Sequence, residues 1–169
     1  SLRTMLVNGT MFPDGGYAID DAYGEQAHWE PFQQAWAASL RERYGGDYSS
    51  LEARQRVAFL LGMASHGMSD EVFDTLFFEL SRQLDPDGHA GSLSFDTATD
   101  VTFAADVGGI LAPEYWLPAD EVVAVFAERI GYSVSQETVA TGHQRLHAAL
   151  AYTEWARQQE ERLTTFSSV

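Results

Sequence analysis

The stretch VAFLLGMASHGMSDEVFDTL, residues 57–76, decides the fold class. Its apolar residues recur at spacings of three and four, which is the period of one face of an α-helix. The stripe extends on both sides, so we expect a long central helix over residues 53–84, begun by a Ser49–Glu52 capping box and ended by the turn motif at 85–88. No segment alternates apolar and polar residues over more than a few positions, and the sequence therefore predicts an all-α fold.

Other segments carry the same period. We expect helices over residues 28–44, 96–111, 119–131 and from a Ser133–Gln136 capping box to about residue 163. Residues 1–26 are rich in Gly, Asp and Tyr and show no helical period, so an ordered loop is expected there. No repeat or low-complexity linker divides the chain, which favours a single domain over residues 1–169, either complete or cut from a longer protein.

The composition excludes several classes of function. Asp and Glu number 25 against 10 Lys and Arg, and the formal net charge of −15 disfavours a general nucleic-acid binder, which needs basic side chains against phosphate. A phosphodiester substrate held through metal ions is still allowed. The chain has no cysteine, so disulfides, thiolate zinc sites and a cysteine nucleophile are excluded. No apolar run reaches the roughly 18 residues of a transmembrane helix.

His66, Asp70 and Asp74 recur at intervals of four within the apolar stretch. On a helix each step of four turns by only about 40°, so the imidazole and both carboxylates project from one face. Burying them without a counter-charge is costly. The spacing leaves two explanations open: a hydrogen-bonded His66–Asp70 pair in the core, or ligands of a metal ion.

Two residues elsewhere can complete such a metal site. His28 is expected to open a helix beside an aromatic cluster, and Asp14 lies in the tight turn at residues 12–16. Each alone is explained as an ordinary helix-end or turn residue. With His66 and Asp70 they form a set of nitrogen and oxygen donors that suits zinc, which takes four ligands. The spacing does not decide whether the four residues meet.

The motifs around these residues resemble a known enzyme family. They are Gly9-Thr10-Met11-Phe12-Pro13-Asp14, Ala27-His28-Trp29-Glu30-Pro31-Phe32, Val57 to His66 with Asp70, Ala104 to Gly109, Tyr115-Trp116-Leu117-Pro118 and His143. In order and spacing they are similar to the zinc-dependent phospholipase C family, and within it to the catalytic domain of the glycosylphosphatidylinositol-specific phospholipases D. The resemblance covers most of the chain.

The resemblance implies an all-α, multi-helix fold of the phospholipase C/P1 nuclease type, with zinc ions bound between its helices. It implies that Asp14, His28, His66 and Asp70 hold one zinc, that Asp70 bridges to a second, and that Asp14 is the catalytic proton acceptor. It implies hydrolysis of a phospholipid or another phosphodiester by zinc-activated water, with transient contact to a membrane surface. An extracellular or periplasmic location is implied as well, although the chain shows no signal peptide.

The sequence departs from the family pattern at the other two zinc positions. The chain begins about where the first family helix ends, so that N-terminal helix and its ligands are expected to be missing. Asp74 and Thr102 stand where histidines are expected, and only Asp106 fits the third zinc. Asp74 and Asp106 can hold a harder ion such as calcium or magnesium, or leave the third position empty. Zinc is therefore expected at one site, whereas the resemblance implies up to three.

The leading interpretation is a zinc-dependent phosphodiester hydrolase acting on phospholipid or glycosylphosphatidylinositol-type substrates. The alternatives are a degenerate, non-catalytic zinc-binding domain and a zinc-dependent nuclease, and the negative charge of the chain disfavours the nuclease. Several aromatic residues either pack in the core or offer apolar surface to a lipid: Trp29, Phe32, Trp36, Tyr115 and Trp116. The sequence does not determine the head group, C-type against D-type cleavage, or the oligomeric state.

Overall fold

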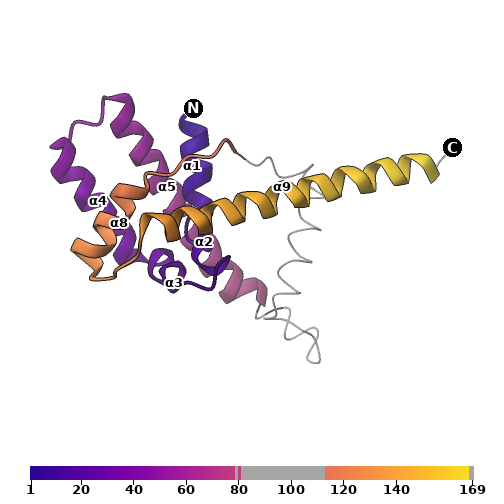
Figure 1. Cartoon of the computed structure of the whole chain (residues 1–169), viewed down its shortest axis with the longest axis horizontal. Coiled ribbons are helices and arrows are strands. Elements are labelled where there is room, and N and C mark those ends of the chain that lie inside the picture. Colours follow the sequence, from indigo (N-terminus) through magenta and orange to yellow (C-terminus); the bar gives the residue numbers. More distant parts are fainter. Residues whose placement is uncertain (79, 81–112, 168–169) are drawn as a thin grey trace. The chain divides into compact units, whose positions relative to one another are not determined.

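The computed structural model describes residues 1–78, 80 and 113–167, in which every regular element is a helix (Figure 1). The helices are α1 (Leu2–Met11), α2 (Asp14–Tyr17), α3 (Tyr23–His28), α4 (Glu30–Tyr44), α5 (Leu51–Val72), the π-helix η1 (Phe73–Phe78), α8 (Ala119–Val125), the π-helix η2 (Phe126–Ile130) and α9 (Gln136–Ser167). No strand occurs in the described residues, so the all-α prediction is confirmed. The phospholipase C/P1-type fold without its first helix stays a prediction.

Two compact units make up the chain. The first comprises residues 1–69 and 113–147, and the second comprises residues 70–112 and 148–169. The candidate site described below lies in the first unit. The expectation of one domain stays a prediction. None of the described helices is long and apolar enough to cross a membrane.

An aromatic core holds the first unit together. Phe12 lies between three other rings, with centroids 5.4 Å from Phe59, 5.8 Å from Phe32 and 5.9 Å from Tyr23. Phe126 of η2 closes the cluster at 4.4 Å from Phe32. All five side chains are fully buried, so they supply much of the apolar burial that stabilises the unit. Because Phe12 directly precedes Pro13 and Asp14, this core also fixes the start of α2.

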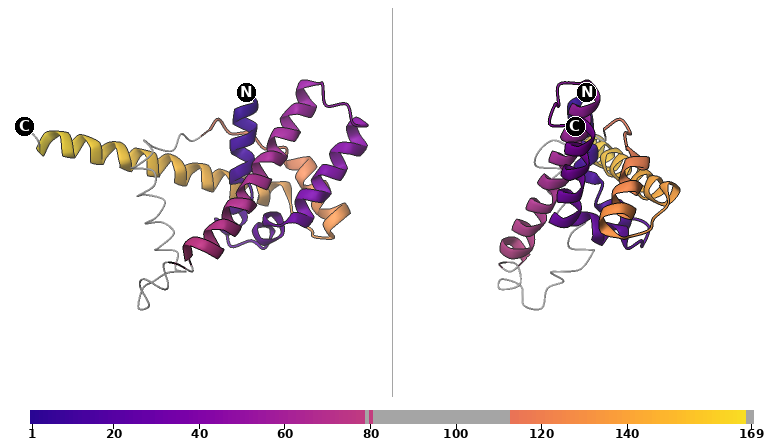
Figure 2. Two further views of the ribbon diagram at one scale, coloured as in Figure 1. Left: turned by 180° about the vertical axis from the view of Figure 1, so that it is seen from behind. Right: turned by 90° about the vertical axis from the view of Figure 1, so that its left-hand side faces the viewer.

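Helices α1 and α5 lie against each other (Figures 1 and 2). Two glycines lie where their backbones meet. A Cβ atom on Gly9 would lie 2.2 Å from the carbonyl oxygen of Phe59, and one on Gly62 would lie 2.1 Å from that of Leu6. Both obstacles are backbone atoms, which cannot rotate away as a side chain can. The crossing therefore requires glycine on both helices, and it sets the position of His66 one turn further along α5.

The prediction of a loop over residues 1–26 was wrong, because α1, α2 and most of α3 lie there. The residues that α1 buries include Asn8 and Gly9, so its core-facing side does not read as an apolar stripe. Helices α2 and α3 have only 4 and 6 residues, which is too short to display a helical period. His28 consequently ends α3, whereas the sequence predicted that it opens a helix; the next helix, α4, begins at Glu30.

The later boundaries are closer to the predictions. The α5 helix begins at Leu51 and passes into a π-helix at Phe73, and the rest of the predicted helix to residue 84 lies largely outside the described residues. The predicted helix over 119–131 is confirmed as α8 and η2, and α9 matches the last predicted helix. The predicted helix over 96–111 lies outside the described residues.

Both helix caps differ from the predicted ones by one or two residues. Ser50, rather than Ser49, accepts a hydrogen bond from the backbone N–H of Ala53. Ser135, rather than Ser133, accepts one from Thr138. Serines occur in close succession before both helices, so the pattern alone does not select the capping residue.

Candidate metal centre

The His28 side chain is almost fully buried, and its orientation is fixed by the backbone of its own helix. Its Nδ1 atom lies 2.7 Å from the carbonyl oxygen of Gly24, one turn earlier in α3. A carbonyl oxygen can only accept a hydrogen bond, so Nδ1 must carry the hydrogen. In the neutral ring the lone pair is then on Nε2, which faces Asp14 and His66.

Asp14 is the first residue of α2 and follows the Phe12-Pro13 dipeptide at the edge of the core. Its Oδ1 atom lies 3.2 Å from His28 Nε2. The Asp14 side chain is 45% exposed, against 5% for the His28 side chain. The carboxylate therefore forms the solvent-facing side of the site, and the imidazole forms its buried side.

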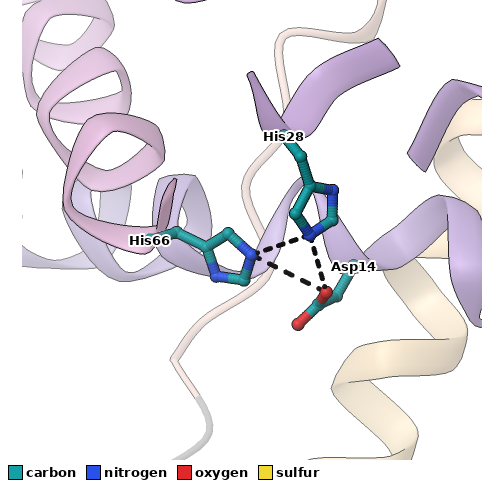
Figure 3. A group of neighbouring side chains, drawn as sticks. All are labelled: Asp14, His28 and His66. Carbon is teal, nitrogen blue, oxygen red and sulfur yellow. Dashed lines mark hydrogen bonds and ion pairs between the residues drawn. The ribbon is translucent and has the colours of Figure 1, made fainter. Parts of the chain in front are cut away.

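His66 brings the third side chain from the long helix α5. Its Nε2 atom lies 3.0 Å from His28 Nε2 and 3.7 Å from Asp14 Oδ1. The three atoms form a closed triangle, which Figure 3 shows with the two rings and the carboxylate pointing at one another. Sequence positions 14, 28 and 66 are thus brought together, and their ligand atoms all lie within 4.8 Å of one another.

The triangle presents nitrogen and oxygen ligand atoms to one common point. The carboxylate of Asp14 can only accept hydrogen bonds, and the Gly24 contact leaves neutral His28 with a lone pair towards it. Two lone pairs at 3.2 Å repel each other unless a hydrogen or a cation lies between them or beside them. A hydrogen on His66 Nε2 would lower this repulsion, because that atom lies 3.0 Å from His28 Nε2, and a metal ion bound by all three residues would remove it. This group can therefore hold a metal ion.

The size and chemistry of the triangle fit zinc. Ligand atoms held about 2.0 to 2.1 Å from a tetrahedral zinc ion are about 3.3 Å apart. The separations here are 3.0, 3.2 and 3.7 Å, which bracket that value. Two imidazole nitrogens suit zinc and other transition metals better than calcium or magnesium, which prefer oxygen ligands.

Two exposed aromatic rings border the site on the His28 side. The Tyr17 ring centroid lies 4.8 Å from that of His28, and the Trp29 centroid lies 6.0 Å from it. Glu25 holds both, because its carboxylate accepts hydrogen bonds from the Tyr17 hydroxyl at 2.6 Å and the Trp29 indole at 2.8 Å. These hydrogen bonds, first that of Tyr17, lower the pKa of the Glu25 carboxyl.

The five aromatic residues that could contact a lipid differ in how far they are exposed to solvent. Phe32 and Trp36 are core residues, with 0% and 1% exposure. Trp116 is partly buried and packs against the core. Trp29 and Tyr115 are exposed at 43% and 42%, so of the five they are the ones that present surface to a ligand.

The remaining predicted ligands are not part of this triangle as described. Asp70 follows His66 by one turn on α5 and is half-buried, but it belongs to the second unit. Asp74 is exposed on η1, also in the second unit. Asp106, with Thr102, lies outside the described residues. Metal binding by Asp70, Asp74 and Asp106 stays a prediction.

A second buried polar cluster joins α1 to α9. Asn8 Oδ1 accepts hydrogen bonds from His143 Nε2 and His147 Nε2, both at 2.9 Å, and from the Trp116 backbone N–H at 3.2 Å. Asn8 Nδ2 donates to the carbonyl oxygens of Thr4 at 2.7 Å and Glu114 at 2.9 Å. Asn8 and His143 are fully buried. These contacts connect α1, α9 and the segment before α8.

Sequence reasoning missed the residues that orient the ligands. The group that orients the His28 ring is the Gly24 carbonyl oxygen, which receives the Nδ1 hydrogen bond. A backbone carbonyl is present in every residue, so no pattern of side chains in the sequence predicts which one will accept this hydrogen bond. The Asn8 cluster was missed as well, although the His143–His147 spacing of four was a signal that both rings lie on one face of α9.

Comparisons with known proteins find a distant relationship. The chain is 26% identical to the phosphatidylinositol-glycan-specific phospholipases D of Rattus norvegicus and Mus musculus, over 78% of its own length. It spans only 17% of the length of each of these relatives. No protein-family model matches the chain. No solved structure matches it either.

Proposed function

We propose that this chain carries the metal site of a zinc-dependent phosphodiester hydrolase that acts on phospholipid or glycosylphosphatidylinositol-type substrates. The observation that carries the proposal is the convergence of His28 Nε2, His66 Nε2 and Asp14 Oδ1 at 3.0 to 3.7 Å. The names of the two relatives, each a phospholipase D, support the reaction class. The positions of the three residues in the sequence match the ligand positions that the family resemblance implies.

Asp14, His28 and His66 would hold one zinc ion, with Asp70 proposed as the fourth ligand. The helical spacing of four between His66 and Asp70 favours this, since it keeps both on one face of α5. Asp74 and Asp106 are proposed as oxygen ligands of a further, harder ion. When bound, zinc lowers the pKa of a water molecule to about 7 and polarises a phosphoryl oxygen.

The chain's own residues supply orientation and proton transfer. The Gly24 carbonyl keeps the His28 hydrogen on Nδ1 and so keeps Nε2 available as a ligand atom. Asp14 is half-exposed and has a second carboxylate oxygen, so it can accept a proton on the solvent side of the site. The exposed rings of Tyr17 and Trp29 lie beside the His28 ring and offer apolar surface next to the site.

The substrate class and location rest on the relatives. Phosphatidylinositol-glycan is part of the name of these relatives, and a lipid-type substrate for this chain is proposed from it. Exposed Trp29 and Tyr115 favour transient contact with a membrane surface, because indole and phenol rings suit the boundary between lipid and water. An extracellular or periplasmic location is proposed with this substrate.

A non-catalytic metal-binding domain is the second candidate. Among the described residues, Asp14, His28 and His66 are the one group of three ionisable ligands found together, whereas the resemblance implies up to three zinc ions. This candidate predicts bound metal without turnover. The nuclease alternative is disfavoured by the net charge of −15.

Metal content and turnover, measured together, test the proposal. Protein purified without chelator or a metal-affinity tag is analysed by inductively coupled plasma mass spectrometry and assayed on mixed-lipid vesicles and single-stranded DNA. Zinc with cleavage of the lipid phosphodiester is expected, and both should be lost in His66→Ala but kept in Gln34→Ala, at an exposed position of α4. Zinc without cleavage would favour the non-catalytic domain, DNA cleavage alone would favour the nuclease, and absence of any metal would overturn the site.

A further inference from the structure

The backbone carbonyl of His28 lies at the junction of α3, α4 and α5. His28 is the last residue of α3, and Trp29 after it is extended, with φ −102° and ψ 162°. The final carbonyls of a helix have no partner within that helix. Since His28 is only 4% exposed, its carbonyl requires a donor from elsewhere in the chain.

The side chain of Gln33 on α4 supplies that donor. Its Nε2 atom lies 3.3 Å from the carbonyl oxygen of His28 and 3.4 Å from that of Met63 on α5. A side-chain amide has two hydrogens, so one Gln33 nitrogen can serve both carbonyls. Met63 lies three residues before His66. One amide group therefore links the backbones that carry the two candidate imidazole ligands.

The contact between these backbones is close. A Cβ atom on Gly67, the residue after His66, would lie 2.9 Å from the His28 carbonyl oxygen and 3.1 Å from Gln33 Nε2. Glycine at this position lets α5 approach the end of α3, and Gln33 holds the two together. The separation of 3.0 Å between the Nε2 atoms of His28 and His66 depends on this approach.

We propose that Gln33 is a positioning residue of the metal centre, which holds His28 and His66 at the separation that one metal ion requires. This inference rests on the proposed function. Gln33 acts through the backbone, because its hydrogen bonds go to carbonyls and not to the ligand rings. Removing its N–H groups should loosen the ligand geometry while leaving each ligand in the sequence.

The test compares two equivalent substitutions in adjacent residues of α4. Gln33→Met keeps nearly the same shape and removes the donor. Gln34→Met is the matched control, because the Gln34 amide is exposed and bonds to the Glu30 side chain of the same helix. Metal-free wild type and variants are titrated with Co²⁺ and followed by visible absorption, which reports the coordination geometry, and their thermal midpoints are recorded without metal.

We expect Gln33→Met to bind Co²⁺ at least about tenfold more weakly than wild type, with altered visible bands, as is typical when a group that orients a ligand is removed. Gln34→Met should match wild type. Equal affinity and spectra for wild type and Gln33→Met would overturn the positioning role alone. If the wild type binds no Co²⁺, both the metal site and this inference are overturned. Should Gln33→Met not fold, Gln33→Glu replaces it, since its carboxylate repels both carbonyls and is expected to weaken binding in the same way.

Discussion

The carbonyl oxygen of Gly24 accepts a hydrogen bond from His28 Nδ1 over 2.7 Å, within a single turn of α3. This contact determines which ring nitrogen faces Asp14 and His66. Histidines that bind metals commonly donate their other N–H to a carbonyl or carboxylate, which fixes both tautomer and orientation. A helix of 6 residues thus orients its own terminal side chain before any ligand binds.

Zinc should stabilise the wild-type chain and not the His66→Ala variant. A ligand that binds only the folded state adds about 2.7 kcal/mol to the free energy of unfolding at 100 times its Kd. His66→Ala removes one corner of the triangle, so this gain should vanish. Urea unfolding of chelator-treated protein, with and without added zinc, measures the effect. Gln34→Ala, at an exposed position of α4, leaves the three ligands unchanged and should retain the gain. Equal stabilisation of His66→Ala and wild type by zinc would exclude His66 as a ligand.

Much of the fold was predictable from the sequence where a long helix shows its period. The α5 stripe runs over several turns, and it placed His66 on a helix correctly. The N-terminal part was not predictable in the same way, because α1 buries Asn8 and Gly9 and because α2 and α3 are very short. Their positions follow from tertiary contacts, such as the close crossing at Gly9 and Gly62, which leave no periodic signal.

The candidate site was also predictable only in part: its ligands were predicted, and the groups that orient them were not. The residue types and the family resemblance predicted Asp14, His28 and His66, and the structure brings these three together. The groups that orient them are a backbone carbonyl of Gly24 and the amide of Gln33. Neither is visible as a motif, because a carbonyl belongs to every residue and a glutamine on a helix is commonly solvent-exposed.

Gly62→Ala should strongly destabilise the chain. The added Cβ atom would lie 2.1 Å from the Leu6 carbonyl oxygen and would force α1 away from α5. Overpacking of this kind typically costs about 1 to 3 kcal/mol, and a backbone obstacle places the cost at the upper end or above. Urea unfolding followed by circular dichroism measures it. Leu61→Ala, at a 56% exposed position next to Gly62, should change the free energy of unfolding by less than about 0.5 kcal/mol.

Metal affinity provides a second measurement on the same Gly62→Ala protein. Displacing α1 also displaces Phe12 and Asp14, which follow it directly, so the folded fraction should bind Co²⁺ more weakly than wild type. Wild-type stability in Gly62→Ala would show that the helices can separate at no cost. That result would contradict the requirement for glycine at the crossing.

Asn8→Ala should be among the most destabilising polar substitutions in the first unit. It removes five hydrogen bonds and leaves the two histidine Nε2 atoms and the carbonyls of Thr4 and Glu114 without this partner. Each buried polar group left unsatisfied costs about 1 to 3 kcal/mol, so a total loss above about 3 kcal/mol is expected.

The control for Asn8 is an amide of similar chemistry on the surface. Gln34→Ala also removes a side-chain amide, but that amide donates to the exposed Glu30 carboxylate. Apart from the change in helix propensity, this substitution should lower the free energy of unfolding by less than about 0.5 kcal/mol. Asn8→Asp should destabilise too, because a carboxylate cannot donate to the two carbonyls. Near-wild-type unfolding of Asn8→Ala would mean that water replaces the amide fully, and the cluster would then not hold α1 to α9.

Buried His143 should make the stability of the fold depend on pH. Burial, and then the neighbouring His147 ring, lower the pKa of His143 from its ordinary value to about 3. The unfolded chain has a histidine pKa of about 6.5, so between these values it binds more protons than the folded chain. The contribution to stability is therefore fully present above about pH 6.5 and is lost as the pH falls towards 3. Its limiting slope is about 1.4 kcal/mol per pH unit.

Comparison with a variant that cannot titrate isolates this effect from the carboxylates. His143→Gln retains an N–H donor towards Asn8 Oδ1 but has no ionisable ring. Urea unfolding in chelator at pH 7.5 and 5.5 should show that the wild type loses up to about 1.4 kcal/mol more than His143→Gln over this interval. His147→Gln should show a smaller difference of the same sign, because burial also lowers the pKa of His147. Equal pH dependence in wild type and His143→Gln would mean that His143 ionises as an exposed histidine does. That result would contradict the prediction, which rests on the complete burial of His143 against Asn8.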